Sequence, residues 1–192
     1  MKKRTFIAVP FTKEIIDNIR RFEDRFREKT GYKGRIIPPE KIHLTIKFLG
    51  DTEVKLFPEI EKVLKDVAME VEPFSLTVKG IGVFPNEKFP RVFWLGVETD
   101  SIHLKELNKL VEAGLVRLGF KKERREFKPH LTISRLKRHL LTNDFFKFLK
   151  NEKDIVIGNF QVNEVDFIES ILKPQGAEYI TISRFTLKGG DK

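Results

Sequence analysis

Two copies of one tetrapeptide carry the residue types that acid–base chemistry needs. His43-Leu44-Thr45-Ile46 recurs as His130-Leu131-Thr132-Ile133, 87 residues further along the chain. Side chains alternate between the two faces of a strand, so the His and Thr of each copy share one face while the Leu and Ile share the other. Each copy therefore presents an imidazole and a hydroxyl on one side and an apolar anchor on the other.

If the two copies face each other across a groove, their imidazoles can act as an acid–base pair. The pKa of an unperturbed histidine lies near neutrality, so a neutral imidazole can take a proton from a nucleophile while a charged one gives a proton to the leaving oxygen. The threonine hydroxyls suit the non-bridging oxygens of a phosphate, where charge gathers in the transition state. This chemistry needs neither a metal nor a cofactor.

Two other interpretations of the tetrapeptides compete with catalysis. A single His-x-Thr is acceptable on any half-buried strand, but its duplication favours a functional role. A two-histidine metal site is also open, although the motifs lack the Asp, Glu or Cys that would complete a ligand shell. The chain has no Cys, which excludes thiolate catalysis and sulfur-ligated metal sites. His103 and His139 lie outside any motif, and we predict that both are surface residues.

Basic residues gather around both tetrapeptides. The formal net charge is +9. Residues 25–47 carry seven basic and two acidic residues, and residues 121–139 carry eight basic and two acidic residues, so the rest of the chain is close to neutral. This distribution favours an anionic partner, either a phosphate group or a nucleic acid, over an ordinary solvated surface.

The length and composition indicate one globular unit. The chain has 192 residues, of which 40% are hydrophobic and 34% charged, enough to form a core and unlike a disordered chain. No apolar run approaches the roughly 18 residues of a membrane span, and the absence of Cys fits a reducing compartment, so we expect a cytoplasmic protein. The high Lys and Glu content with few Gln matches the bias of thermophile proteins.

Hydrophobic periodicity predicts an α+β fold with largely antiparallel sheets. The pattern mixes helices with runs of strands that turns connect, and no Gly-rich phosphate loop occurs. The predicted strands span 4–9, 42–49, 74–83, 92–97, 130–136, 155–162, 164–172 and 179–187, and the predicted helices span 13–29, 53–71, 100 or 101 to 118, and 144–150.

The motifs in their context resemble those of the two-histidine phosphoesterase superfamily. HLTIKFLG after a first strand FIAVP, FKPHLTISRL after a basic loop, and RVFWLGV between them are similar in detail to the RNA 2',3'-cyclic phosphodiesterases, also called 2'-5' RNA ligases. The resemblance implies a single two-lobed domain over residues 1–192, with pseudo-twofold symmetry and a cleft between two antiparallel sheets. It also implies metal-independent hydrolysis of RNA 2',3'-cyclic phosphate ends to 2'-phosphates, with 2'-5' ligation as the reverse reaction.

The same resemblance assigns roles to individual residues. His43 is the expected proton donor to the leaving 3'-oxygen and His130 the base that activates water, while Thr45 and Thr132 bind phosphate. Arg135 matches an arginine that binds phosphate in the family, but strand alternation puts it on the face of Leu131 unless a bulge intervenes.

Two phenylalanines near the first motif are candidates for stacking on a base. Phe6 and Phe48 could provide an aromatic surface, since single-stranded RNA binding often uses aromatic side chains, although a role in the core is the alternative. The expected partner is RNA with a 2',3'-cyclic phosphate end, tRNA fragments included, and the expected state is a monomer without a membrane anchor. The competing function is a noncatalytic RNA-binding protein that uses the same basic cleft.

Overall fold

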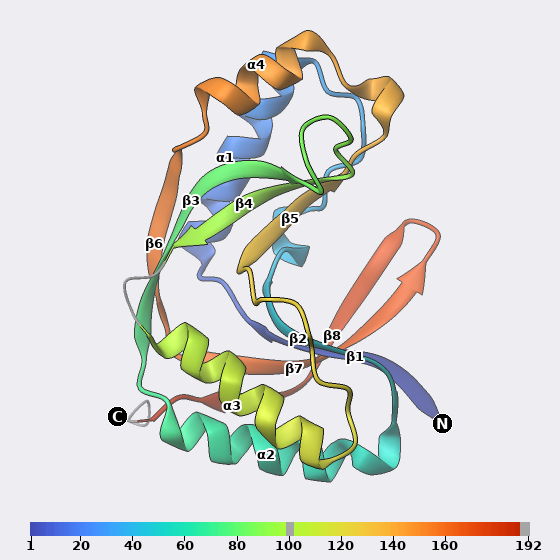
Figure 1. Cartoon of the computed structure of the whole chain (residues 1–192), viewed down its shortest axis with the longest axis vertical. Coiled ribbons are helices and arrows are strands. Elements are labelled where there is room, and N and C mark those ends of the chain that lie inside the picture. Colours follow the sequence, from blue (N-terminus) through green and yellow to red (C-terminus); the bar gives the residue numbers. More distant parts are fainter. Residues whose placement is uncertain (99–101, 189–192) are drawn as a thin grey trace.

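Two four-stranded antiparallel sheets form the framework of the two lobes (Figure 1). The computed structural model describes residues 1–98 and 102–188. The sheet of the first lobe has the order β2-β1-β7-β8 and that of the second lobe has the order β5-β4-β3-β6. The strands are β1 (Lys2–Val9), β2 (Leu44–Glu53), β3 (Phe74–Phe84), β4 (Val92–Glu98), β5 (His130–Arg135), β6 (Val156–Val162), β7 (Glu164–Lys173) and β8 (Gly176–Thr186). The helices are α1 (Lys13–Thr30), α2 (Phe57–Glu70), α3 (His103–Arg117) and α4 (Asn143–Asn151).

The two motif strands occupy equivalent places in the two sheets. β2 and β5 are both edge strands, paired with β1 and β4 respectively. Leu44 and Leu131 are fully buried, and the Ile of each motif is buried with them. The apolar half of each motif therefore anchors its strand in the core, as the alternation of residue types predicts.

Helices are exchanged between the lobes. α1 connects β1 to β2 of the first lobe but packs against β6 and α4 of the second, whereas α3 connects β4 to β5 of the second lobe but packs against α2 and β2 of the first. Figure 1 shows α1 and α4 on the upper lobe and α2 and α3 beneath the lower one. Each lobe thus completes its core with a helix that follows a strand of the other lobe, so the two lobes depend on each other.

The local sequence explains the length and the buried face of α1. Thr12 caps the helix by accepting a hydrogen bond from the Ile15 N–H, and Gly31 ends it in the left-handed conformation at φ 61°. Ile19, Phe22 and Phe26 continue the buried stripe that Ile15 begins.

The predicted fold class is confirmed, and the element boundaries differ by a few residues. The second predicted strand begins at Leu44 rather than at residue 42 and runs on to Glu53. α2 begins at Phe57 because a 3₁₀ turn precedes it and Pro58 suits a first helical turn. The predicted start of the third helix, at residue 100 or 101, lies outside the described residues. None of the helices in the described ranges has the length and hydropathy needed to cross a membrane.

Candidate active site

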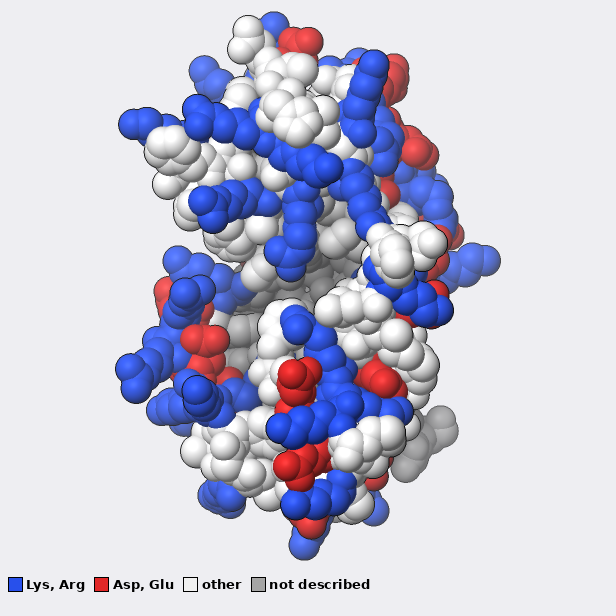
Figure 2. All heavy atoms as spheres, turned by 90° about the vertical axis from the view of Figure 1, so that its right-hand side faces the viewer, with Lys and Arg blue, Asp and Glu red and all other residues white. Residues whose placement is uncertain are grey.

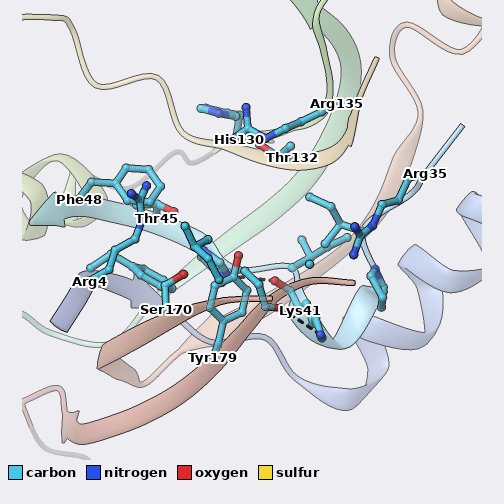
Figure 3. Close-up of a pocket in the computed structure, with 18 of the residues that line it drawn as sticks. Arg4, Arg35, Lys41, Thr45, Phe48, His130, Thr132, Arg135, Ser170 and Tyr179 are labelled. Carbon is cyan, nitrogen blue, oxygen red and sulfur yellow. Dashed lines mark hydrogen bonds between the residues drawn. The ribbon is translucent and has the colours of Figure 1, made fainter. Parts of the chain in front are cut away.

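A cavity of about 610 Å³ lies between the two lobes and brings the predicted site residues together (Figure 3). The first lobe contributes β1, β2, β7 and β8 to its walls, and the second contributes β5. All seven candidate residues line it, namely His43, Thr45, His130, Thr132, Arg135, Phe6 and Phe48. Five of the lining side chains are cationic, and they are Arg4, Arg35, Lys41, Lys137 and the candidate Arg135. None of the described lining residues is acidic. The cavity is therefore suited to an anion.

The two histidines are held in the same way. His43 Nδ1 lies 3.1 Å from the Lys41 carbonyl oxygen, and His130 Nδ1 lies 2.7 Å from the Lys128 carbonyl oxygen. A carbonyl only accepts, so each neutral imidazole donates its Nδ1–H and leaves Nε2 as the unprotonated nitrogen. Both histidines thus present the same nitrogen for proton transfer, fixed by the carbonyl two residues earlier in the chain.

The surroundings of the two histidines differ. The ring of His43 stacks on Phe6, with centroids 4.5 Å apart, and meets the edge of Tyr179 at 4.9 Å. Burial lowers the pKa of His43 to about 4, while its hydrogen bond to the Lys41 carbonyl acts in the opposite direction. The lowered pKa makes His43 neutral at pH 7 in the free protein. His130, by contrast, meets one aromatic ring among the described residues, that of Phe84, with centroids 5.0 Å apart.

A bulge interrupts each motif strand and turns a later side chain into the cavity. Along β5 the register with β4 shifts between Thr132 and Ser134, so Ile133 is the extra residue, and Ile133 and Ser134 are both buried. Strand alternation therefore reverses, and Arg135 lines the cavity despite its parity. The same shift occurs in β2 between Thr45 and Lys47, and there it turns Phe48 to the cavity.

The two phenylalanines differ in what they offer a ligand. Phe6 is 2% exposed, and the His43 imidazole covers one face of its ring, so it packs in the wall of the cavity. Phe48 is 66% exposed and lines the cavity. Phe48 rather than Phe6 therefore has an aromatic surface open to a ligand.

The second of the two buried residues at each bulge, which is polar, holds the segment that precedes the other motif. Lys47 donates to Glu112 on α3 at 2.6 Å and to the Lys121 carbonyl, in the basic loop before His130, at 3.0 Å. Ser134 donates to the Arg35 carbonyl, in the linker before His43, at 2.7 Å. The hydrogen bonds from Lys47 to the Lys121 carbonyl and from Ser134 to the Arg35 carbonyl, which we call the reciprocal tethers, fix each motif strand to the loop that leads into the other.

The β7–β8 hairpin forms one side of the cavity and is fastened to the linker before His43. Lys41 donates to the Ala177 carbonyl at 3.0 Å. Gly176, at φ 122°, lies so close to Arg35 that an added Cβ would be 1.9 Å from a guanidinium nitrogen. These contacts hold Tyr179 beside His43.

Several lining residues were not anticipated from the sequence. Arg4 shares the strand face of Phe6, so alternation along β1 could have identified it. Tyr179 and Ser170 come from segments that carry no motif, and their place depends on the sheet order, whereas Lys41 belongs to the basic segment 25–47 that the sequence singled out. His103 and His139 do not line the cavity, and His139 is exposed.

Comparison with known proteins places these features in a family. The family model described as "LigT like Phosphoesterase" matches the chain twice, over residues 9–94 and 95–179, and each match contains one motif. The chain is 32% identical to the RNA 2',3'-cyclic phosphodiesterase of Methanothermobacter thermautotrophicus, covering 97% of this chain and 100% of that protein. It is also 32% identical to the protein of the same name from Thermotoga maritima, covering 97% of each chain.

Solved structures share the fold. TT0787 of Thermus thermophilus superposes with a TM-score of 0.81 at 26% identity, covering 97% of this chain and 98% of that one. E. coli LigT complexed with 3'-AMP superposes with a TM-score of 0.72 at 22% identity, covering 97% and 99%. The α+β architecture with two pseudo-symmetric halves is therefore shared with these proteins.

The environment of His43 predicts its titration. In an NMR titration the His43 imidazole should protonate near pH 4, because burial disfavours the charged form. Tyr179→Ala should raise this midpoint by admitting water, and inorganic phosphate should raise it in the unaltered protein by adding negative charge. A midpoint that neither change moves would contradict this account of the site.

The tether of Lys47 predicts a loss of stability on substitution. Glu112→Gln leaves the buried Lys47 ammonium without its counter-charge, so the free energy of unfolding in urea should fall by about 3 kcal/mol. Lys55→Met is the control, because it breaks the exposed Lys55–Glu53 pair and should lower the free energy of unfolding far less than Glu112→Gln does. Equal losses for the two variants would show that Lys47 does not depend on Glu112.

Proposed function

Since the chain belongs to the LigT-like phosphoesterase family, we propose that it hydrolyses RNA 2',3'-cyclic phosphate ends to 2'-phosphates. The observation that carries this proposal is the presence of both His-x-Thr motifs on the walls of one basic cavity, each histidine with Nδ1 held by a backbone carbonyl. The names of the relatives support the choice of substrate. The chain acts in this proposal as a single two-lobed domain over residues 1–192.

The proposed mechanism divides proton transfer between the two lobes. His130 Nε2 takes a proton from water as the water oxygen bonds to phosphorus, and charged His43 gives its Nε2 proton to the 3'-oxygen as the bond from phosphorus to that oxygen breaks. The product is a 2'-phosphate monoester with a free 3'-hydroxyl. Neutral His43 must first be protonated, and the negative charge of the bound phosphate favours that step by raising its pKa.

The remaining cavity residues hold the substrate in this proposal. Thr45 and Thr132 donate hydrogen bonds from their hydroxyls to the non-bridging oxygens, and the Arg135 guanidinium pairs with the phosphate charge. The exposed ring of Phe48 stacks on a base of the substrate. No step uses a metal or a cofactor.

Ligation needs no further residue. If the 5'-hydroxyl of a second RNA takes the place of water, the same pair of histidines can bond its oxygen to phosphorus as the bond to the 3'-oxygen breaks, which leaves a 2'-5' linkage and a free 3'-hydroxyl. We propose that fragments ending in a 2',3'-cyclic phosphate, those of tRNA included, are the substrates.

Both histidines come from one chain, which supports a monomer, and the absence of Cys supports a cytoplasmic setting.

The first test of the function is turnover of a nucleoside 2',3'-cyclic phosphate. His43→Ala and His130→Ala should each lower kcat at least about a hundredfold, because each removes one partner in proton transfer. His139→Ala, at an exposed histidine outside the cavity, is the matched control and should retain the rate. Activity should survive EDTA, and a loss that a divalent ion restores would rule out the proposed mechanism. Binding of RNA without turnover would favour the noncatalytic function instead.

The threonines provide a second test. Thr45→Ala and Thr132→Ala should each lower kcat by about tenfold to a thousandfold with folding intact, as expected for the loss of one donor to a developing charge. Thr→Ser keeps the hydroxyl and should restore most of the rate. If Thr→Ala leaves kcat unchanged, the two residues only support their strands.

A further inference from the structure

An exposed aromatic side chain lies outside the cavity, at the tip of the β3–β4 hairpin. Phe89 is 47% exposed. The Lys88 Nζ and the Arg138 guanidinium carbon each lie 5.5 Å from the centroid of its ring. Asn86 accepts a hydrogen bond from the Phe89 N–H at 3.0 Å, which shapes the loop that presents the ring. Phe89 thus offers an aromatic surface flanked by two cations.

This surface lies next to residues that line the catalytic cavity. Phe84, where the hairpin strand ends, contacts His130, and the ring of Phe84 also packs on Trp94. On the other side, Lys137 lines the cavity and is the chain neighbour of Arg138, which contacts Phe89. Phe89 therefore contacts a residue that directly follows a cavity-lining residue in the chain, on the second lobe.

The charge around Phe89 matches a polyanion. The two segments 85–91 and 135–139 together carry five cationic residues, which are Lys88, Arg91, Arg135, Lys137 and Arg138, against the single carboxylate of Glu87. Figure 2 shows that Lys and Arg predominate on the upper lobe above the hollow, whereas acidic and basic side chains mix on the lower lobe. Cations that follow a backbone beside an aromatic ring are the features with which proteins bind single-stranded nucleic acid.

We propose that Phe89 and Arg138 form a second binding site for the RNA substrate, at which a base upstream of the cyclic phosphate stacks on Phe89 while Arg138 and Lys88 pair with the backbone. This site deepens the proposed function and rests on it. Phe89 does not line the cavity, so we expect that a mononucleotide held there does not contact its ring. The site therefore selects for an RNA strand over a cyclic mononucleotide without contributing to the chemistry.

The test compares a cyclic mononucleotide with an eight-nucleotide single-stranded RNA that ends in a 2',3'-cyclic phosphate. Phe89→Ala should lower kcat/KM for the octamer by about fivefold to a hundredfold, the effect of losing one stacked base, and should change kcat/KM for the mononucleotide less than about twofold. Phe89→Leu keeps an apolar side chain but loses the ring, so it should behave as Phe89→Ala. Arg138→Gln should also weaken octamer turnover and make it less sensitive to salt.

Phe146→Ala is the matched control, because Phe146 is 37% exposed on α4 and does not line the cavity. Phe146→Ala should leave kcat/KM unchanged for both the octamer and the mononucleotide. Octamer turnover that is unchanged in Phe89→Ala and Phe89→Leu overturns the second site but leaves the proposed function intact. An equal loss for both substrates also overturns it, since Phe89 would then support the fold near His130. If the unaltered protein turns over neither substrate, the proposed function fails and this inference fails with it.

Discussion

The whole site depends on one constraint, the attachment of two edge strands that belong to different lobes. A histidine at the edge of one sheet can work with a histidine at the edge of another only if the two sheets keep a fixed separation. The reciprocal tethers supply this constraint, because Lys47 holds the loop before His130 and Ser134 holds the linker before His43. The exchange of α1 and α3 between the lobes also holds the two sheets together, because each helix connects strands of one lobe and packs against the other lobe.

The bulges make the tethers and the cavity compatible. In a regular strand, a side chain between two cavity-facing residues would point into the core and the next would return to the cavity. The extra residue in each motif strand places two side chains inward in succession, and the second of these carries the tether. The extra residue also makes Phe48 and Arg135, which occupy equivalent positions in the two halves, face the cavity. A single local irregularity therefore provides both the attachment of the lobes and a further pair of cavity side chains.

The sequence predicted the fold class, most element positions and the convergence of the two motifs, because hydrophobic period and motif duplication are local signals. It could not predict which helix covers which sheet, since α1 and α3 are amphipathic whichever lobe they pack on. Lys47 was likewise indistinguishable from an ordinary surface lysine, because its partners Glu112 and Lys121 are distant in the chain. Strand alternation placed Arg135 on the wrong face, since a bulge has no clear signature in one sequence.

The asymmetry between the halves gives a duplicated motif two different tasks. Both histidines have the same tautomer, but Phe6 and Tyr179 enclose His43, whereas His130 meets one ring. The same divergence separates Phe48 from Arg135, which occupy equivalent positions and present an aromatic ring and a positive charge. A symmetric pair of histidines would respond alike to a bound anion and would have no preferred direction of proton transfer. Because burial lowers the pKa of His43, the negative charge of a bound phosphate would raise that pKa and favour protonation by solvent of the residue that is proposed to release the 3'-oxygen.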